Sequence, residues 1–305
     1  MLTFALQRLL SAVPTLLILA TLVFFLLRAA PGGPLDAERA LPPEVQAQVA
    51  AAYHLDEPLW RQFGRYLGGA LQGDLGPSFQ YPGRSVNELI AAGFPVSLQL
   101  GLSAMALALL LGCGAGALAA LRRDRWPDHG VMALAVAGLS IPTFVVAPLL
   151  VLAFAVTLGW LPAGGWGAWR SAVLPVVALA LPQVAYLARL MRGSMAEVLQ
   201  QNYIRTARAK GLPEHRVILR HALLPALIPV LSYLGPATAQ IITGSVVVEQ
   251  IFSIPGLGRH FVQGALNRDY TVVMGVVLFY GALIVAFNFV VDLLYGVLDP
   301  RVRPR

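Results

Sequence analysis

Six apolar stretches, each long enough to cross a lipid bilayer, constrain this chain more than any other feature of its sequence. They occupy residues 9–30, 96–121, 131–158, 172–192, 224–250 and 272–298. A membrane-spanning helix needs about 20 mostly apolar residues, because the hydrocarbon core of a bilayer is ~30 Å thick. The first stretch ends at Ala29-Ala30-Pro31, a poor cleavage site, so we interpret it as a retained span rather than a signal peptide. The sequence therefore predicts an all-α integral membrane protein with six transmembrane helices.

The composition excludes a soluble globule and several kinds of enzyme. Only 12% of the 305 residues are charged, against about 25% in soluble domains, and 57% are hydrophobic. The single cysteine, Cys113, excludes an intrachain disulfide and a cysteine-ligated zinc site. The five histidines have no metal-ligand spacing, and neither a His-Glu-x-x-His pair nor a Gly-x-Ser-x-Gly elbow occurs. We therefore expect no metal site and no catalytic residues.

The basic residues predict an orientation in the membrane. The net charge is +7, carried by 21 arginines and one lysine. If the N-terminus is cytoplasmic, the four internal segments hold 14 of the 22 basic residues: 1–8, 122–130, 189–221 and 299–305. Cytoplasmic loops are enriched in lysine and arginine, so we expect both termini in the cytoplasm. This placement of the basic residues explains the net positive charge of the chain, so no nucleic-acid partner is needed to account for it.

The segment 31–95 is too long and too patterned for a plain loop. Pro43 suits the first position of one helix, and Asp56 is expected to cap a second helix that has Pro58 in its first turn. Apolar residues then recur at every fourth position: Leu59, Phe63, Leu67 and Leu71. Ser85–Glu88 has the pattern of a capping box ahead of a short helix. We expect a small helical layer on the outer face, serving either as a scaffold or as a contact for an extracellular partner.

The most informative stretch lies between the fourth and fifth spans. Residues 194–210 favour a helix, Gly211 suits a left-handed helix end, and Pro213 restarts a helix at once. The prediction is a short, arginine-rich helix–turn–helix outside the membrane. Its basic residues are either lipid-facing or part of a docking surface for a cytoplasmic protein.

The sequence of this stretch is similar to a known motif. Tyr203-Ile-Arg-Thr-Ala-Arg-Ala-Lys-Gly211 resembles the EAA loop of type I ABC importer permeases, in the form used by dipeptide, oligopeptide and nickel permeases. Further stretches agree with that family in order along the chain: Leu55–Trp60 with Gly73–Gly76, Phe252–Arg259 and Asp292–Arg301.

The resemblance implies a non-catalytic permease subunit of an ATP-driven importer in a bacterial cytoplasmic membrane, with dipeptides or oligopeptides as expected substrates. It implies four kinds of partner: a second homologous permease, two ABC ATPase subunits or domains, an extracytoplasmic substrate-binding protein and membrane lipid. The implied divisions are an N-terminal span (1–30), an extracytoplasmic helical segment (31–95), a five-helix core (96–299) containing a coupling loop (194–216), and a cytoplasmic tail (300–305).

The coupling loop is expected to engage the ATPases. Its implied residues are Tyr203, Arg205, Thr206, Ala207, Arg208, Ala209, Lys210, Gly211 and Leu212. The only lysine of the chain is Lys210, between Ala209 and Gly211, so no phosphate-binding Gly-Lys-Ser/Thr motif is present. ATP and magnesium are therefore expected on partner subunits, with no cofactor on this chain.

Polar and small residues near the spans give further candidates. Ser140, Gln183, Gln240 and Asn288 are candidates to line a substrate path, although interhelical hydrogen bonds explain such residues equally well. Glu249 and Asp292 are intramembrane acids whose role the sequence leaves open, and Asp124 and Asp128 suggest a solvated charge cluster.

Pro255 and Gly256 predict a type II turn on the outer side, with a positive φ at the glycine. Three glycines are expected to allow close helix approach: Gly112, Gly114 and Gly116.

A second class of protein stays open at this stage. An ion-coupled secondary transporter would work without an ATPase and would favour an inverted repeat and buried acids near the membrane midplane. Co-purification of an ATPase would separate the two classes. The substrate is also open, since the resembling family handles peptides, nickel chelates, glutathione and some sugars.

Overall fold

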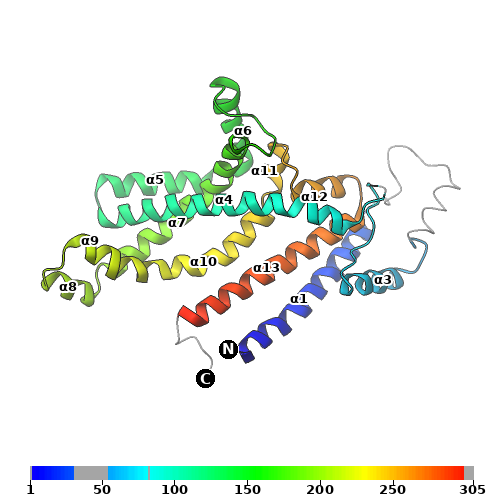
Figure 1. The fold of residues 1–305 in the computed structure, drawn as a ribbon, viewed down its shortest axis with the longest axis horizontal. Helices are drawn as coiled ribbons and strands as arrows, with labels where there is room; N and C mark the ends of the chain where they lie inside the picture. The colour runs from blue at the N-terminus through cyan, green and yellow to red at the C-terminus, as the bar shows by residue number, and fades with distance from the viewer. Residues whose placement is uncertain (1, 31–53, 82, 299–305) are drawn as a thin grey trace. The chain divides into compact units, whose positions relative to one another are not determined.

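The computed structural model describes the backbone of residues 2–30, 54–81 and 83–298, and the side chains of these segments except residues 2–9 and 292–298. The described residues form helices and no β-strand (Figure 1). The elements are α1 (Leu2–Ala29), α3 (Leu59–Leu71), α4 (Val86–Leu121), α5 (Trp126–Ser140), α6 (Thr143–Leu150), the π-helix η1 (Val151–Thr157), α7 (Trp169–Val198), α8 (Asn202–Ala209), α9 (Glu214–Arg216), the π-helix η2 (Val217–Ala222), α10 (Leu223–Thr243), α11 (Val246–Ile251), α12 (Leu257–Leu266) and α13 (Tyr270–Leu298).

Five helices of the described chain are long and apolar enough to cross a membrane, and a bent pair makes up to six. The five are Leu10–Ala29, Val86–Leu121, Trp169–Val198, Glu214–Ile251 and Tyr270–Val291. They cover five of the six predicted spans.

The third predicted span is not one continuous helix. α5 ends at Ser140, α6 begins at Thr143, and the pair is bent by 102°. Ile141 between them is extended, with φ −92° and ψ 119°. The residue before a proline avoids the helical region because the proline ring crowds it, and Pro142 follows Ile141. The third predicted span, 131–158, is therefore present as a bent pair of helices, which brings the number of candidate spans in the described residues to six when the pair is counted as one.

The described residues divide into two compact units, one drawn mainly from residues 1–96 and 256–289 and the other from 97–255. The core of the first unit joins the start of α4, Leu257 of α12 and the first turns of α13. Its members are Val86, Leu89, Ile90, Leu257, Val272, Val276 and Tyr280. The expected helix over Leu59–Leu71 is present, and Phe63 packs against Phe24 of α1 with ring centroids 5.0 Å apart.

The two expected caps in the first unit had different outcomes. Glu88 donates its backbone N–H to Ser85 Oγ at 3.2 Å, so Ser85 caps α4 as predicted, but the helix then runs on to Leu121 instead of ending early. The expected cap at Asp56 was wrong, because α3 begins after Pro58 with no side-chain cap. The helix expected from Pro43 lies outside the described residues.

The second unit is organised around α7, which packs against α5, α6, α10 and α11. Helix α4 also approaches α7 closely, through Gly112 and Gly116. A Cβ built on Gly112 would lie 2.7 Å from Leu187 Cβ, and one on Gly116 would lie 2.8 Å from Met191 Cβ. Gly114 points elsewhere and has nothing within 4 Å, so two of the three expected close-approach glycines serve that purpose. Within this unit, α8 and α9 form a tip beyond the ends of α7 and α10 (Figure 1).

Candidate functional site

The predicted helix–turn–helix between the fourth and fifth spans is present as residues 202–216, which we call the coupling segment. It consists of α8, the turn at Gly211 and α9, and α9 continues through η2 into α10. The expected helix over 194–210 is interrupted, because α7 ends at Val198 and Gln201 is extended before α8 begins. The segment is therefore continuous with α10 through helical residues and joined to α7 by a short turn.

The turn of the coupling segment is a Schellman motif. Gly211 has φ +76°, the left-handed conformation that the sequence predicted. Gly211 donates its N–H to the carbonyl of Arg208 at 2.9 Å, and Leu212 donates to the carbonyl of Ala207 at 3.3 Å. Those two bonds satisfy carbonyls that the end of α8 would otherwise leave unpaired.

Helix α8 has one buried face and one exposed face. Ile204 is fully buried and Ala207 is nearly so. The exposed positions are Tyr203, Arg205, Thr206, Arg208, Ala209 and Lys210, with Gly211 exposed and Leu212 half-buried beyond them. Residues three apart on a helix share a face, so Ile204 and Ala207 attach α8 to the protein. The basic side chains project from the other face.

An ion pair closes the coupling segment. Arg208 Nε lies 3.1 Å from Glu214 Oε2, and the second guanidinium nitrogen contacts the other carboxylate oxygen. This bidentate pair joins α8 to α9 across the turn. The hydrogen-bonded carboxylate raises the pKa of Arg208 above its ordinary value. The pair was not among the sequence predictions, although an acidic residue three positions beyond the helix-ending glycine was its signal.

The candidate path residues have different surroundings. Gln183 of α7 accepts a hydrogen bond from Tyr233 of α10 at 2.7 Å, and Tyr233 stacks on Tyr186 with centroids 4.2 Å apart. Ser140 donates to the carbonyl of Val136 in its own helix, at 2.8 Å. Gln240 is exposed on α10, and Asn288 belongs to the first unit. Among the described residues, no hydrogen bond links any two of the four candidates.

The acid near the end of the fifth span is buried and hydrogen-bonded. Glu249 of α11 has no exposed surface. Its Oε1 accepts hydrogen bonds from Ser97 of α4 at 2.7 Å and from Ser245 at 2.5 Å. Glu249 therefore joins α4 to the break between α10 and α11. The side chain of the other intramembrane acid, Asp292, lies outside the described residues.

The turn at Pro255-Gly256 differs from its prediction. Gly256 is extended, with φ −91° and ψ 174°, and directly precedes α12, so the predicted type II turn was wrong. The positive φ falls on Ser253 instead, at 52°. Ser253 donates to the carbonyl of Gln250, and Ile254 donates to the carbonyl of Glu249 at 2.8 Å, which is the same Schellman geometry that ends α8. The end of α11 thus sets the turn, not the Pro255-Gly256 pair.

Two family models match the chain. Residues 1–100 match the N-terminal model of the binding-protein-dependent transport system membrane component. Residues 110–304 match the model of the binding-protein-dependent transport system inner membrane component. The chain belongs to this permease family.

Curated relatives of the permease match over its whole length. It is 56% identical to the oligopeptide transport system permease protein OppB of Salmonella typhimurium over 306 residues, covering 99% of this chain and 100% of that protein. It is 46% identical to the dipeptide transport system permease protein DppB of Bacillus subtilis, covering 98% and 97% of the two chains.

Solved structures confirm the fold class. An amino acid ABC transporter is 19% identical, with a TM-score of 0.56 and coverage of 68% of this permease and 94% of that chain. The methionine ABC transporter MetNI in an inward-facing conformation has the same TM-score at 17% identity, with coverage of 69% and 96%. The family and these folds agree with the resemblance seen in the sequence.

One charged contact in the permease contradicts its sequence interpretation. Asp128 was expected in a solvated cluster but is buried, and its carboxylate accepts hydrogen bonds from Arg192 of α7 at 2.8 and 3.1 Å. Asp124 donates its backbone N–H to the same carboxylate at 3.0 Å. This pair joins residues 64 positions apart. A buried carboxylate needs such a partner, because burial of an unpaired charge is costly.

Proposed function

We propose that this permease is a membrane-spanning subunit of an ATP-driven importer for dipeptides or oligopeptides. The observation that carries the proposal is its full-length identity of 56% to an oligopeptide permease, combined with a dipeptide permease at 46%. An extracytoplasmic binding protein delivers the peptide, and the helix bundle passes it across the membrane.

The chain performs no covalent chemistry in this proposal. It assembles with a second, homologous permease and with two ABC ATPase subunits or domains. ATP and magnesium are held by the ATPases, in keeping with a sequence whose only lysine lies outside any phosphate-binding motif. The mechanical part of transport belongs to the helices of this chain.

The coupling segment is suited to transmit force from the ATPases. Buried Ile204 and Ala207 fix α8, while the Arg208–Glu214 pair and the Schellman turn fix its angle to α9. From Glu214 the helical chain continues through η2 and α10 to Thr243. When ATP closes the ATPase dimer, the exposed face of α8 is pushed, and α10 moves with it. A flexible loop would absorb the same push.

The proposed orientation places the coupling segment and both termini in the cytoplasm. Reporter fusions after Arg125 and after Arg305 should report cytoplasm, and a fusion near Gln80 should report the exterior. A cytoplasmic signal near Gln80 would reverse the orientation.

Among the path candidates, Gln240 is the one that we retain for contact with substrate, because it is exposed on α10 whereas Gln183 is held by Tyr233. A Gln240→Cys variant should react with a water-soluble thiol reagent, and transported peptide should slow the reaction. Unchanged labelling in the presence of peptide would remove Gln240 from the path.

The decisive experiment substitutes Gly211 by valine. A residue with a Cβ at this φ costs roughly 1–2 kcal/mol, and the larger side chain would stand on the exposed docking face. We expect Gly211→Val to insert normally but to recover less ATPase in pull-downs and to lose ATP-dependent peptide uptake in vesicles.

Gly130→Val is the matched control, because a Cβ on Gly130 meets nothing within 4 Å and its φ is not positive. If Gly211→Val keeps its ATPases and transports peptide normally, the coupling role of residues 202–216 is wrong. Peptide uptake by the permease without any ATPase would instead favour the secondary-transporter class.

A further inference from the structure

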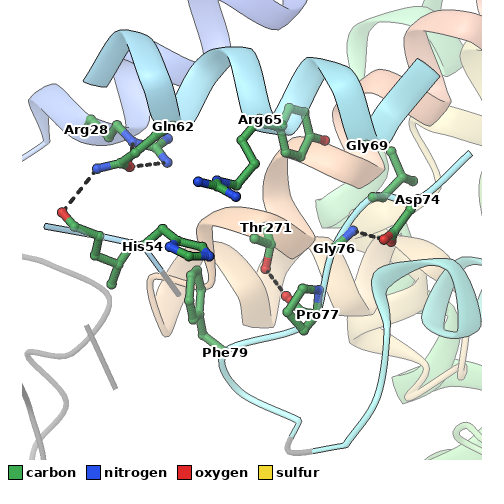
Figure 2. A pocket seen from close by; sticks show the side chains of 13 residues that line it. Arg28, His54, Gln62, Arg65, Gly69, Asp74, Gly76, Pro77, Phe79 and Thr271 are labelled. Carbon is green, nitrogen blue, oxygen red and sulfur yellow. Dashed lines mark hydrogen bonds between the residues drawn. The ribbon is translucent and has the colours of Figure 1, made fainter. Parts of the chain in front are cut away.

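A small cavity in the first unit has no part in the coupling segment or the candidate path. It has a volume of about 280 Å³ and lies between the end of α1, the helix α3, the loop after it and the start of α13 (Figure 2). The polar side chains that line it include Arg28, His54, Gln62, Arg65, Tyr66 and Thr271. Figure 2 shows Arg65 reaching from α3 into the cavity toward His54 and Thr271.

Arg28 is a half-buried cation with no carboxylate beside it in the described part of the chain. Its Nε and Nη2 both donate to Gln62 Oε1 at 3.1 Å, and its guanidinium lies 3.5 Å from the centre of the Phe24 ring. A neutral amide and an aromatic face orient the guanidinium, and neither supplies the negative charge that would balance it. Because burying an unpaired charge is costly, an anion in the cavity would stabilise this arrangement.

Arg65 provides a second cation. One of its nitrogens lies 2.7 Å from Glu57 Oε1, and the fork geometry of a guanidinium leaves other N–H donors for the cavity. The carboxylate that lines the cavity, Asp74, lies at the end opposite Arg28 and accepts a hydrogen bond from the N–H of Gly76 at 2.9 Å (Figure 2). Arg65 and His54 share the Glu57 carboxylate, so Arg28 is the cation at its end of the cavity that no carboxylate of the described residues pairs with.

Tyr66 adds a hydroxyl group to the lining of the cavity. Its hydroxyl oxygen is buried and has no hydrogen-bond partner among the described residues. Burial raises the pKa of Tyr66, so the phenol remains a protonated donor. Buried polar groups are nearly always hydrogen-bonded, and an unpaired one beside a cavity points to a missing ligand.

The position and size of the cavity indicate what the ligand is. Arg28 is at the end of the span Leu10–Ala29, and Thr271 is at the start of the span Tyr270–Val291. The cavity thus lies where two spans leave the hydrocarbon, at the depth of lipid head groups. Its volume is below the ~300–1,000 Å³ of pockets for drug-sized ligands, so it suits the head group of a larger molecule rather than the whole molecule.

We propose that this cavity binds the phosphate of an anionic phospholipid, with Arg28 and Arg65 as its cationic ligands and Tyr66 as a hydroxyl donor. Guanidinium forks match the oxygens of a phosphate, and two cations beside one cavity favour a head group with a net negative charge. The terminal carboxylate of a peptide offers the same oxyanion chemistry from a different source, and the experiment must separate the two.

The test measures lipid binding to the complete transporter complex by native mass spectrometry. Phosphatidylglycerol and phosphatidylcholine with identical acyl chains are titrated separately. We expect the wild-type complex to bind phosphatidylglycerol about tenfold or more tightly than phosphatidylcholine, and Arg28→Gln and Arg65→Gln each to remove most of that preference. Arg61→Gln is the matched control, because Arg61 lies on the same helix but stacks on Trp60, outside this cavity. It should leave the preference unchanged.

Several results would overturn the proposal. Equal affinity for the two lipids would do so, as would an unchanged preference in Arg28→Gln or an equal loss in Arg61→Gln. Displacement of phosphatidylglycerol by a peptide with a free C-terminus, but not by its C-terminal amide, would assign the cavity to a peptide carboxylate instead. If Arg28→Gln does not assemble with its ATPases, Arg65→Gln alone decides, since that side chain is largely exposed.

Discussion

Gly116 of α4 packs against α7 so closely that one added methyl group should force the two helices apart. An ideal Cβ at this position would lie 2.8 Å from Met191 Cβ and 3.0 Å from the backbone nitrogen of Arg192. Ordinary Cβ contacts lie at 3.4–4 Å, so backbone atoms of α7 must shift before an alanine fits. Forcing an extra methyl group into a packed interface typically costs about 1–3 kcal/mol.

Gly114 offers an internal control for the same substitution. It lies two residues earlier on the same helix, and a Cβ there meets nothing within 4 Å. Both alanine variants gain the same helix propensity over glycine, about 1 kcal/mol, so this gain cancels in the comparison. The difference in stability between Gly116→Ala and Gly114→Ala should therefore be about 1–3 kcal/mol, with Gly116→Ala the less stable.

The assay is thermal unfolding of the purified permease complex in detergent, followed by tryptophan fluorescence. Gly114→Ala should unfold at the wild-type temperature or slightly above it, and Gly116→Ala clearly below it. Equal unfolding temperatures for the two variants would refute the packing of α4 against α7 through Gly116.

Three further predictions concern other helix ends and buried groups. Ser253→Gly should stabilise the permease by roughly 1 kcal/mol, because Ser253 holds a positive φ that glycine adopts freely; an unchanged unfolding temperature would count against this. Glu249→Ala should destabilise the permease by about 1–3 kcal/mol, because it removes the oxygen that accepts hydrogen bonds from the hydroxyls of Ser97 and Ser245. Glu249→Gln retains an amide oxygen that can accept these bonds, so equal losses of stability in both variants would contradict their role. Burial, with Arg259 and Arg84 nearby, lowers the pKa of His260, so the folded state binds the proton less readily than the unfolded chain. Stability should therefore fall as the pH drops below about 6.5, and His260→Asn should flatten that dependence in unfolding scans at several pH values.

The sequence interpretation succeeded where the signal was local. Ser85 caps α4 because a serine hydroxyl reaches a backbone N–H only three residues away. Gly211 ends α8 because no other residue adopts a positive φ so cheaply, and both bonds of its turn lie within five residues. The coupling segment could be predicted from such signals, and its resemblance to a permease motif indicated the family.

The sequence did not show which of several prolines and glycines would bend a helix or set a turn. Proline lies inside α1, α4, α6, α7 and α10 without ending them, yet Ile141-Pro142 separates α5 from α6 by a 102° bend. Pro255-Gly256 has the composition of a turn, yet the left-handed residue is Ser253, because the end of α11 sets the geometry first. Amino-acid composition alone does not show which proline breaks a helix or which residue takes the positive φ of a turn.

By itself, the sequence determined the number and length of the apolar segments and the side chains available for pairing. Those features depend on the thickness of a bilayer and on bonds between near neighbours, which are the same in any fold. Only the tertiary structure decided that Asp128 pairs with Arg192, that Glu249 meets Ser97, and that Gly116 rather than Gly114 faces α7. Each of these contacts joins residues more than 60 positions apart, so it exists only after the helices have packed.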